Sequence, residues 1–205
     1  MIAIIDNIYN NLKSLSNALD LLNKPYKIIK VQDLSENFSH AIIPGVGHFS
    51  KAIEELKKDN GDKKIIEFSK KKKPILGISL GMQLLSSSSE EGGITKGLDL
   101  IPGTVNKISI NKDQYLPHIG WNSVKILKNH FILEGVKNEM DFYFVHSYCF
   151  NLKENSHKVG KTIYGSEFNS IVSKENIVGV QFHPEKSQKY GLKILENFCS
   201  WKNNA

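Results

Sequence analysis

The chain has 205 residues, 40% of them apolar, and this length and composition suit a single domain spanning residues 1–205 with a full-sized core. No apolar run approaches the ~18 residues that a membrane span requires, and the first residues lack the basic leader of a signal peptide. The net charge is +6, yet all 27 basic residues are lysine, whereas a nucleic-acid reader normally uses arginine for bidentate contacts. We therefore expect a cytoplasmic protein that binds neither a membrane nor nucleic acid.

Short apolar runs and stretches of helical periodicity alternate along the first half of the chain. The apolar runs predict buried strands at residues 1–5, 26–31, 41–43 and 74–78. Apolar residues at helical spacing predict helices with stripes at Leu12, Leu15, Leu19 and Leu22 and at Phe49, Ala52, Ile53 and Leu56, with further helices at residues 65–72 and 80–85. Asn10 or Asn11 is the expected cap of the first helix. The lysine run at residues 70–73 is expected to be a solvated helix end rather than a phosphate-binding patch.

The second half of the chain is richer in expected strands. After a helix end and loop at residues 86–93, strands are predicted at residues 104–110, 142–148, 158–164, 170–173 and 178–182, and a last helix at about residues 190–201. The alternation in the first half is typical of parallel strands joined by helices. We therefore expect an α/β fold with a mixed, mainly parallel central sheet, antiparallel at an edge, and helices on both faces. Reactive groups in such folds collect at the carboxyl ends of the strands.

One turn has the form of a nucleophile site. Gly77-Ile78-Ser79-Leu80-Gly81 reads G-x-S-x-G between a predicted strand and a predicted helix, which is the context of a nucleophile elbow. Such a turn holds its central side chain above the sheet, near helix N–H groups that stabilise developing negative charge. Taken alone, the pentapeptide fits an ordinary strand–helix turn with a capping serine equally well.

A second candidate group lies where the last predicted strand ends. Pro184 stops strand pairing there, and in an extended segment His183 and Glu185 point the same way. The glutamate can then orient the imidazole, as in a catalytic triad. Alone, a capping histidine beside a surface glutamate is the simpler interpretation. Together with the elbow, the pair predicts a hydrolytic or acyl-transfer triad of Ser79, His183 and Glu185.

Two families of triad enzymes fit these residues. In serine esterases of the α/β-hydrolase type the acid precedes the histidine, whereas here it follows by two residues, and the chain is short for that fold. The sequence more closely resembles class I glutamine amidotransferases, whose elbow reads Gly-x-Cys-x-Gly-x-Gln and whose acid follows the histidine as His-Pro-Glu. Within that class it resembles the glutaminase subunits of imidazole glycerol phosphate synthases. The matching stretches are residues 44–47, 77–83, 97–103, 117–122, 143–148 and 179–188.

The resemblance implies a class I glutamine amidotransferase fold and a role for each matching residue in the hydrolysis of L-glutamine. Ser79 stands at the nucleophile position, His183 is the base and then the acid, and Glu185 orients His183. The implied oxyanion donors are backbone N–H groups of Gly45, Val46, Gly47 and Leu80. The implied glutamine-binding residues are Gln83, His146, Ser147 and Tyr148, and the implied partner-facing residues are Tyr143, Lys186 and Asn11. Without the triad, residues 44–47 would be an ordinary turn and residues 143–148 a core strand.

The sequence departs from the family pattern in two places. Ser79 replaces a cysteine whose thiol has a pKa near ~8.5, lowered further beside a protonated histidine, so we expect glutamine binding to persist while hydrolysis falls by several orders of magnitude. Either a deliberate substitution that traps substrate or a natural paralogue accounts for it, and the intact remainder of the triad favours the first. In addition, residues 7–11 lack both glycines of the family's loop after the first strand, which favours a different partner or altered coupling to it.

From the resemblance we expect a heterodimer in which ammonia passes to a (β/α)₈-barrel synthase that makes imidazole glycerol phosphate in histidine biosynthesis. Two alternatives stay open: a subunit that supplies ammonia for amidation of a surface-polysaccharide sugar, and a catalytically silent glutamine-binding or partner subunit. No metal or organic cofactor is expected, because His118, His146 and His183 lie on different segments without metal-ligand spacing. Cys149 and Cys199 are expected to be buried, unpaired thiols.

Overall fold

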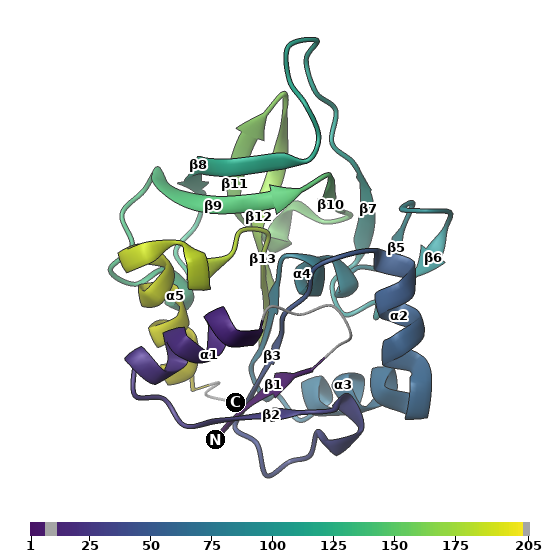
Figure 1. Cartoon of the computed structure of the whole chain (residues 1–205), viewed down its shortest axis with the longest axis vertical. Coiled ribbons are helices and arrows are strands. Elements are labelled where there is room, and N and C mark those ends of the chain that lie inside the picture. The colour runs from purple at the N-terminus through teal and green to yellow at the C-terminus, as the bar shows by residue number, and fades with distance from the viewer. Residues whose placement is uncertain (7–11, 203–205) are drawn as a thin grey trace.

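The computed structural model describes residues 1–6 and 12–202, and its centre is a mixed β-sheet flanked by helices (Figure 1). Five neighbouring strands run parallel in the order β2, β1, β3, β4 and β13. They are β1 (Ile2–Ile5), β2 (Tyr26–Ile29), β3 (His40–Ile43), β4 (Ile75–Ile78) and β13 (Ile177–Val180). All but β2 are buried along their whole length, as expected of parallel strands covered on both faces.

Beyond β13 the sheet continues through mainly antiparallel pairings. The strands along this path are β12 (Ser166–Lys174), β10 (Tyr148–Leu152), β7 (Gly103–Lys107), β5 (Ser88–Ser89) and β6 (Thr95–Lys96). A branch from β12 consists of β11 (Lys158–Tyr164), β8 (His118–Ile126) and β9 (Met140–His146), each antiparallel to the next. In Figure 1, β8 and β9 lie across one end of the central parallel strands.

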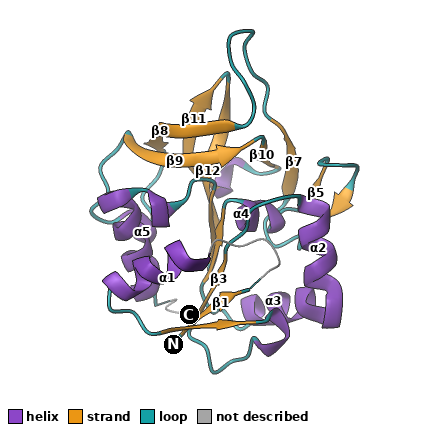
Figure 2. Ribbon diagram, in the orientation of Figure 1, coloured by secondary structure: helices purple, strands orange, loops and turns teal. Residues whose placement is uncertain are grey.

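Helices cover both faces of the central sheet (Figure 2). One face carries α1 (Leu12–Leu21) and α5 (Gln188–Ser200), and the other carries α2 (Phe49–Lys57), α3 (Gly61–Lys70) and α4 (Leu80–Leu84). Successive residues of β1 enter different cores, because side chains alternate along a strand. Ile4 shares a core with Leu15 of α1, whereas Ala3 shares the opposite core with Phe49 of α2. The predicted fold class, a mixed and centrally parallel α/β sheet, is confirmed.

Two expectations for the second half are wrong, and one strand was missed. Residues 86–93 do not form only a helix end and loop, because Ser88–Ser89 pairs with Thr95–Lys96 as a hairpin. Residues 142–148 are not one strand, since β9 pairs with β8 while β10 pairs with β7 and β12. The nine-residue strand β8 was not predicted at all. Its apolar Ile119 and Trp121 are 60% and 48% exposed, so the strand lacks the inward apolar pattern that reveals a half-buried strand.

The first half differs from prediction only at element ends. Strand β2 stops at Ile29, and residue 31 begins a 3₁₀ turn, Val31–Asp33. The lysine run begins at the last residue of α3, and two of its members form ion pairs, Lys71 with Glu36 at 2.5 Å and Lys72 with Glu175. The proposed caps Asn10 and Asn11 lie outside the described residues.

The two cysteines are free, with Cys149 buried and Cys199 partly buried. Burial raises the pKa of the Cys149 thiol to about 11 and that of Cys199 to about 12, so neither is a thiolate at neutral pH. In the described ranges, none of the helices combines the length and the apolar character that a bilayer crossing requires.

Close backbone contacts dictate the glycines of the elbow. A Cβ atom on Gly81 would lie 1.7 Å from the carbonyl oxygen of Ile43, and one on Gly77 would lie 2.6 Å from the carbonyl oxygen of Gly81. A Cβ on Gly45 would lie 2.9 Å from the Cβ of Leu80. Helix α4 therefore rests directly on the backbone of β3 and of the loop that follows it, which fixes the height of the elbow above the sheet.

We expect Gly81→Ala to destabilise the fold by roughly 3 kcal/mol or more, at the upper end of overpacking costs. A loss of stability would be diagnostic, because replacing glycine with alanine inside a helix normally stabilises the helix by about 1 kcal/mol. Urea unfolding measures the difference. Gly93→Ala is the control, since a Cβ there meets nothing within 4 Å and costs only the strain of a φ of +108°. Equal losses for the two variants would contradict the packing argument.

Candidate active site

Three loops meet at the carboxyl ends of β3, β4 and β13. Strand β4 lies between the other two, in a parallel register that sets Ile78 beside Val180. Ser79 follows β4, residues 44–47 follow β3, and His183 comes shortly after β13. The N–H of Ser79 donates to the carbonyl of Val180 at 2.8 Å, so the ladder between β4 and β13 extends to the serine itself. Sheet order thus brings the three sequence-predicted segments side by side.

Ser79 is held in a conformation that side chains rarely adopt. Its backbone has φ 55° and ψ −113°, and its side chain is almost completely buried. This is the strained strand-to-helix turn of a nucleophile elbow. The serine makes no capping hydrogen bond to α4, so the interpretation as a capping serine is wrong. Among the described residues its hydroxyl has no hydrogen-bond partner, which leaves it available to a ligand.

His183 and Glu185 form a buried pair beside the elbow. Imidazole Nδ1 lies 2.8 Å from Glu185 Oε1, and the two side chains are 4% and 6% exposed. The expectation that this segment stays extended is wrong, because Pro184–Lys186 forms one turn of 3₁₀ helix. The turn closes through the N–H of Lys186, which donates to the His183 carbonyl at 3.0 Å. This short turn, rather than the alternation of a strand, brings the carboxylate to the ring.

The second ring nitrogen of His183, Nε2, makes no hydrogen bond to the described residues. With Nδ1 donating to a carboxylate, Nε2 of the neutral ring is an acceptor. It is buried and has no partner within the described part of the chain, a state that costs about 1–3 kcal/mol. The hydrogen bond expected between Ser79 and His183 is therefore not formed here. Catalytic hydrogen bonds are often long without substrate and tighten only in the reacting complex.

The loop after β3 approaches the elbow closely. Gly47 has a φ of +105°, which favours glycine, and Gly45 packs against Leu80. The N–H of Leu80, one of the implied oxyanion donors, donates to the carbonyl of Gly45 at 3.3 Å. That bond is long, but it occupies the donor. Leu80 can serve an oxyanion only after this contact with Gly45 opens.

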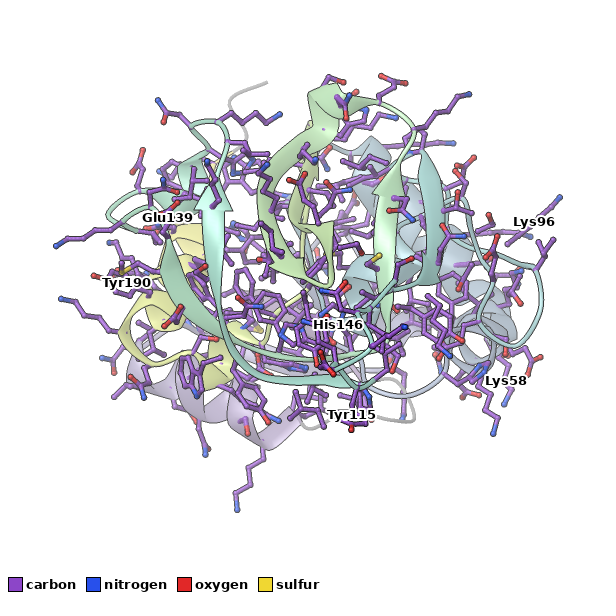
Figure 3. The ribbon with its side chains drawn as sticks, turned by 90° about the horizontal axis from the view of Figure 1, so that it is seen from above. Lys58, Lys96, Tyr115, Glu139, His146 and Tyr190 are labelled. Atoms are coloured by element: carbon purple, nitrogen blue, oxygen red, sulfur yellow. The ribbon has the colours of Figure 1, made fainter. Side chains whose placement is uncertain are left out.

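A cavity of about 190 Å³ opens beside Ser79. It is bounded by the loop after β3, by the elbow and α4, and by the turn that joins β9 to β10. The sequence-predicted residues in its lining are Val46, Gly47, Ser79, Leu80, Gln83, His146, Ser147 and Tyr148. Seen from above, His146 lies well inside the outline of the molecule, whereas Tyr115 lies at its rim (Figure 3). The cavity thus gathers the nucleophile position and the implied glutamine-binding residues.

Three residues of the cavity lining were not assigned a role from the sequence, namely Glu91, Pro117 and Val145. Glu91 lines it from the loop between β5 and β6, and its Oε2 accepts the N–H of Phe49 at the start of α2, at 2.8 Å. Pro117 lines it just before β8. Glu91 and Pro117 adjoin strands that the sequence did not predict, whereas Val145 belongs to the strand predicted at residues 142–148. Glu91 is placed at the cavity by the pairing of β5 with β6, and local sequence periodicity does not reveal this pairing.

The implied partner-facing residues lie next to the triad histidine. Lys186 Nζ is 5.8 Å from the ring centroid of Tyr143, whose backbone carbonyl accepts the N–H of His183 at 2.9 Å. Tyr143 also meets Trp121 edge-on, with centroids 6.1 Å apart. With the exposed Ile119, these rings form an apolar surface on β8 and β9. Asn11, the third implied partner residue, lies outside the described residues.

Three histidines are neutral at physiological pH. Burial lowers the pKa of His118 to about 4 and that of His146 to about 3, and burial also lowers the pKa of His130 to about 4. Within residues 1–6 and 12–202, no group of three or more histidine, cysteine, aspartate or glutamate residues is placed to hold a metal ion.

Comparison with known proteins identifies relatives along nearly the whole chain. The family model for glutamine amidotransferase class-I matches residues 2–201. The chain is 46% identical over 202 residues to the imidazole glycerol phosphate synthase subunit HisH of Methanocaldococcus jannaschii, with 97% of this chain and 98% of that protein covered. The subunit of the same name from Sulfurimonas denitrificans is 43% identical over 206 residues, covering 99% of both chains.

Solved structures of low sequence identity share the fold. The PurLQS structure from Thermotoga maritima superposes with a TM-score of 0.75 at 14% identity, over 97% of both chains. A glutamine amidotransferase from Thermotoga maritima superposes with a TM-score of 0.66 at 16% identity, over 96% of this chain and 81% of that one.

Replacing Ser79 with glycine is expected to stabilise the fold by about 1 kcal/mol, because glycine adopts this backbone conformation without the Cβ penalty. Ser79→Ala is the matched variant, since it loses the same hydroxyl and keeps the Cβ, and it should bring no gain. Urea-unfolding midpoints report both. If the two variants were equally stable, the turn would store no strain.

The free energy of unfolding is expected to decrease as the pH falls from 6.5 toward 5. His118, His130 and His146 have folded-state pKa values of about 4, 4 and 3, below the unfolded value of 6.5. The unfolded chain therefore binds more protons in this range, and each histidine costs up to about 1.4 kcal/mol per pH unit, a slope approached toward pH 5. Urea unfolding across this range measures the slope. His130→Asn, which is remote from the cavity, should remove one histidine's share, and an unchanged slope would refute the assignment.

Proposed function

The chain belongs to the class-I glutamine amidotransferase family, and from that premise we propose that it is the glutaminase subunit of an imidazole glycerol phosphate synthase. It takes L-glutamine and delivers ammonia to a synthase partner in histidine biosynthesis. The relatives named for that subunit match almost end to end at 43% and 46% identity, which favours this partner over amidation of a polysaccharide sugar. We place the complex in the cytoplasm, where the two free thiols stay reduced.

The observation that carries this function is the buried His183–Glu185 pair. Its 2.8 Å contact orients the ring, its Nε2 is unbonded among the described residues, and the pair follows β13, the strand next to the one that presents Ser79. A base held in one tautomer beside a strained nucleophile is the arrangement that acyl transfer needs. A surface ion pair would be exposed and would leave no buried acceptor unpaired.

In the proposed reaction, Ser79 Oγ attacks the side-chain amide carbon of glutamine while His183 Nε2 takes the hydroxyl proton. His183 then gives that proton to the amide nitrogen, which leaves as ammonia, and a γ-glutamyl ester remains on Ser79. A water molecule that loses a proton to His183 attacks the ester, and His183 returns that proton to Ser79 Oγ as glutamate leaves. The N–H groups of Val46, Gly47 and Leu80 are the assigned oxyanion donors, the last once its bond to Gly45 has opened.

The polar lining of the cavity fits the rest of a glutamine molecule. Glu91 and the side-chain oxygen of Gln83 are acceptors, and we assign the α-ammonium group to them. The Ser147 hydroxyl and the polypeptide around Tyr148 form the opposite part of the lining, and we assign the α-carboxylate to them. The amide end of the substrate then lies over Ser79.

The apolar surface on β8 and β9 is the proposed contact with the synthase, which by resemblance is a (β/α)₈ barrel. Ile119 and Trp121 are exposed there, and Tyr143 and Lys186 stand beside them. The surface lies next to His183, where ammonia is released. Docking at this face would cover the exit of the site and direct ammonia into the partner instead of into solvent.

A serine at position 79 is expected to cripple the hydrolysis. A hydroxyl must lose its proton during attack, whereas a cysteine beside a histidine and a helix start is readily a thiolate. This feature also supports a second candidate function, a silent subunit that binds glutamine or its partner without chemistry. The occupied N–H of Leu80 is consistent with that alternative.

Ser79→Cys is expected to raise glutamate release by several orders of magnitude, measured with the synthase partner that co-purifies from the source cell. The gain should vanish when His183→Asn is added, because the thiolate then lacks its base. Ser79→Ala should bind glutamine as the unmodified chain does and release none. Unchanged turnover in Ser79→Cys, with glutamine still bound, would refute the hydrolytic function and leave the silent subunit.

A further inference from the structure

A network of hydrogen bonds runs from β8 to the wall of the cavity. Asn122 Nδ2 lies 3.3 Å from His118 Nε2, and His118 Nδ1 lies 3.0 Å from His146 Nε2. His146 Nδ1 in turn lies 2.9 Å from the carbonyl oxygen of Tyr148. His118 and His146 are 3% and 6% exposed, so these two rings are shielded from water. The network links β8, β9 and β10, and it ends on a residue that lines the cavity.

The groups at both ends of this hydrogen-bond network determine which nitrogen of each imidazole carries the proton. At one end the Tyr148 carbonyl only accepts, so His146 must carry its proton on Nδ1. At the other end Asn122 uses its Oδ1 to accept the N–H of Ser123 at 2.8 Å, and its Nδ2 donates to the carbonyl of Ile163 at 3.0 Å. Its amide is therefore oriented with Nδ2 toward His118, whose Nε2 must accept.

The bond between the two rings then has one possible arrangement. Since His118 Nε2 accepts, His118 carries its proton on Nδ1 and donates it to Nε2 of His146. Both rings are neutral in this arrangement, in agreement with pKa values of about 4 and 3. The His118 ring is also clamped by stacking, with centroids 4.0 Å from Tyr164 and 5.1 Å from Phe144.

The same carbonyl orients Gln83. Gln83 Nε2 donates to the Tyr148 oxygen at 2.9 Å and to Gln181 Oε1 at 3.1 Å, which uses both of its hydrogens. The side chain is buried and lines the cavity, so its only free hydrogen-bonding atom is the acceptor Oε1. If the Gln83 amide were rotated by 180°, its oxygen would face the Tyr148 carbonyl oxygen. Two acceptors would then repel each other at this position. The cavity would then present a donor instead.

We propose that His118 is a positioning residue for substrate recognition: through His146 and the Tyr148 carbonyl it holds Gln83 with its oxygen toward the cavity. The role rests on the proposed binding of glutamine. It makes the cavity selective for a ligand that carries a hydrogen-bond donor, the α-ammonium group, at that position. His118 touches neither the ligand nor the reacting atoms, and its position on β8 was not marked as a binding residue by the sequence.

A matched pair of variants isolates the proton that His118 donates. Asparagine places an N–H where the ring has Nδ1, whereas leucine has the same branched shape without a donor. Neither variant keeps the imidazole ring that stacks on Tyr164. We expect His118→Leu to weaken glutamine binding by about tenfold, the effect of one lost hydrogen bond, and His118→Asn to weaken it by less than about threefold. Calorimetry on the full chain measures both, since Ser79 limits turnover.

A second ligand separates positioning from general loss of structure. Glutaramate is glutamine without its α-amino group, so it makes no contact with the oxygen of Gln83. We expect its affinity to change by less than about twofold in either variant. The ratio of glutamine to glutaramate affinity should then fall about tenfold in His118→Leu alone. Equal weakening of both ligands, or equal behaviour of the two variants, would overturn the proposal.

The proton order can be tested without any ligand. Chemical shifts of ¹⁵N-labelled histidine side chains distinguish the tautomers, and His118→Asn and His146→Asn assign the two signals. We expect both rings to be neutral with the proton on Nδ1 at pH 7. An Nε2-protonated tautomer for either ring would overturn the proposal. If neither glutamine nor glutaramate bound the protein, the proposed function would fail. The ¹⁵N measurement would still show whether the hydrogen-bond network has the proposed proton order.

Discussion

The placement of β4 between β3 and β13 is the constraint on which the rest of the site depends. Parallel strands deliver their carboxyl ends to one edge, so the residues that follow these three strands must lie together. Gly81 then seats α4 on the carbonyl of Ile43 with no room for a side chain. The position of Ser79 is thereby fixed by backbone contacts with β3 and β13. The free energy of folding the sheet offsets the strain of its unfavourable dihedral angles.

Much of the fold could be predicted from the sequence because local residue patterns determine its strands and helices. Buried parallel strands appear as short apolar runs, and the helices on both faces appear as stripes such as Phe49 to Leu56. The elbow and the His183–Glu185 pair were found because short motifs place particular residue types beside strand ends. Even there, the geometry differed: Glu185 reaches the imidazole through a 3₁₀ turn and not through an extended strand.

The parts that escaped prediction depend on pairings between distant segments. Strand β8 exposes Ile119 and Trp121, so its pattern runs opposite to that of an ordinary half-buried strand. The hairpin of β5 and β6 is held by only two residue pairs, too few to be visible in periodicity. Glu91 and His118 belong to these two elements, and although residues 117–122 match the family, no local pattern assigned either residue a binding role. The roles assigned to the triad, the oxyanion donors and the glutamine-binding residues remain predictions of the family resemblance.

The contact between Glu91 and α2 has a consequence for the handedness of the ligand. One carboxylate oxygen of Glu91 is held by the N–H of Phe49, so the group cannot swivel to follow a ligand that arrives in another orientation. Under the proposed assignment, the ammonium group, the carboxylate and the amide of glutamine meet three separately fixed parts of the cavity wall. Three fixed points around one tetrahedral carbon accept one mirror image and reject the other. The cavity would thus distinguish L-glutamine from its enantiomer before any bond is broken.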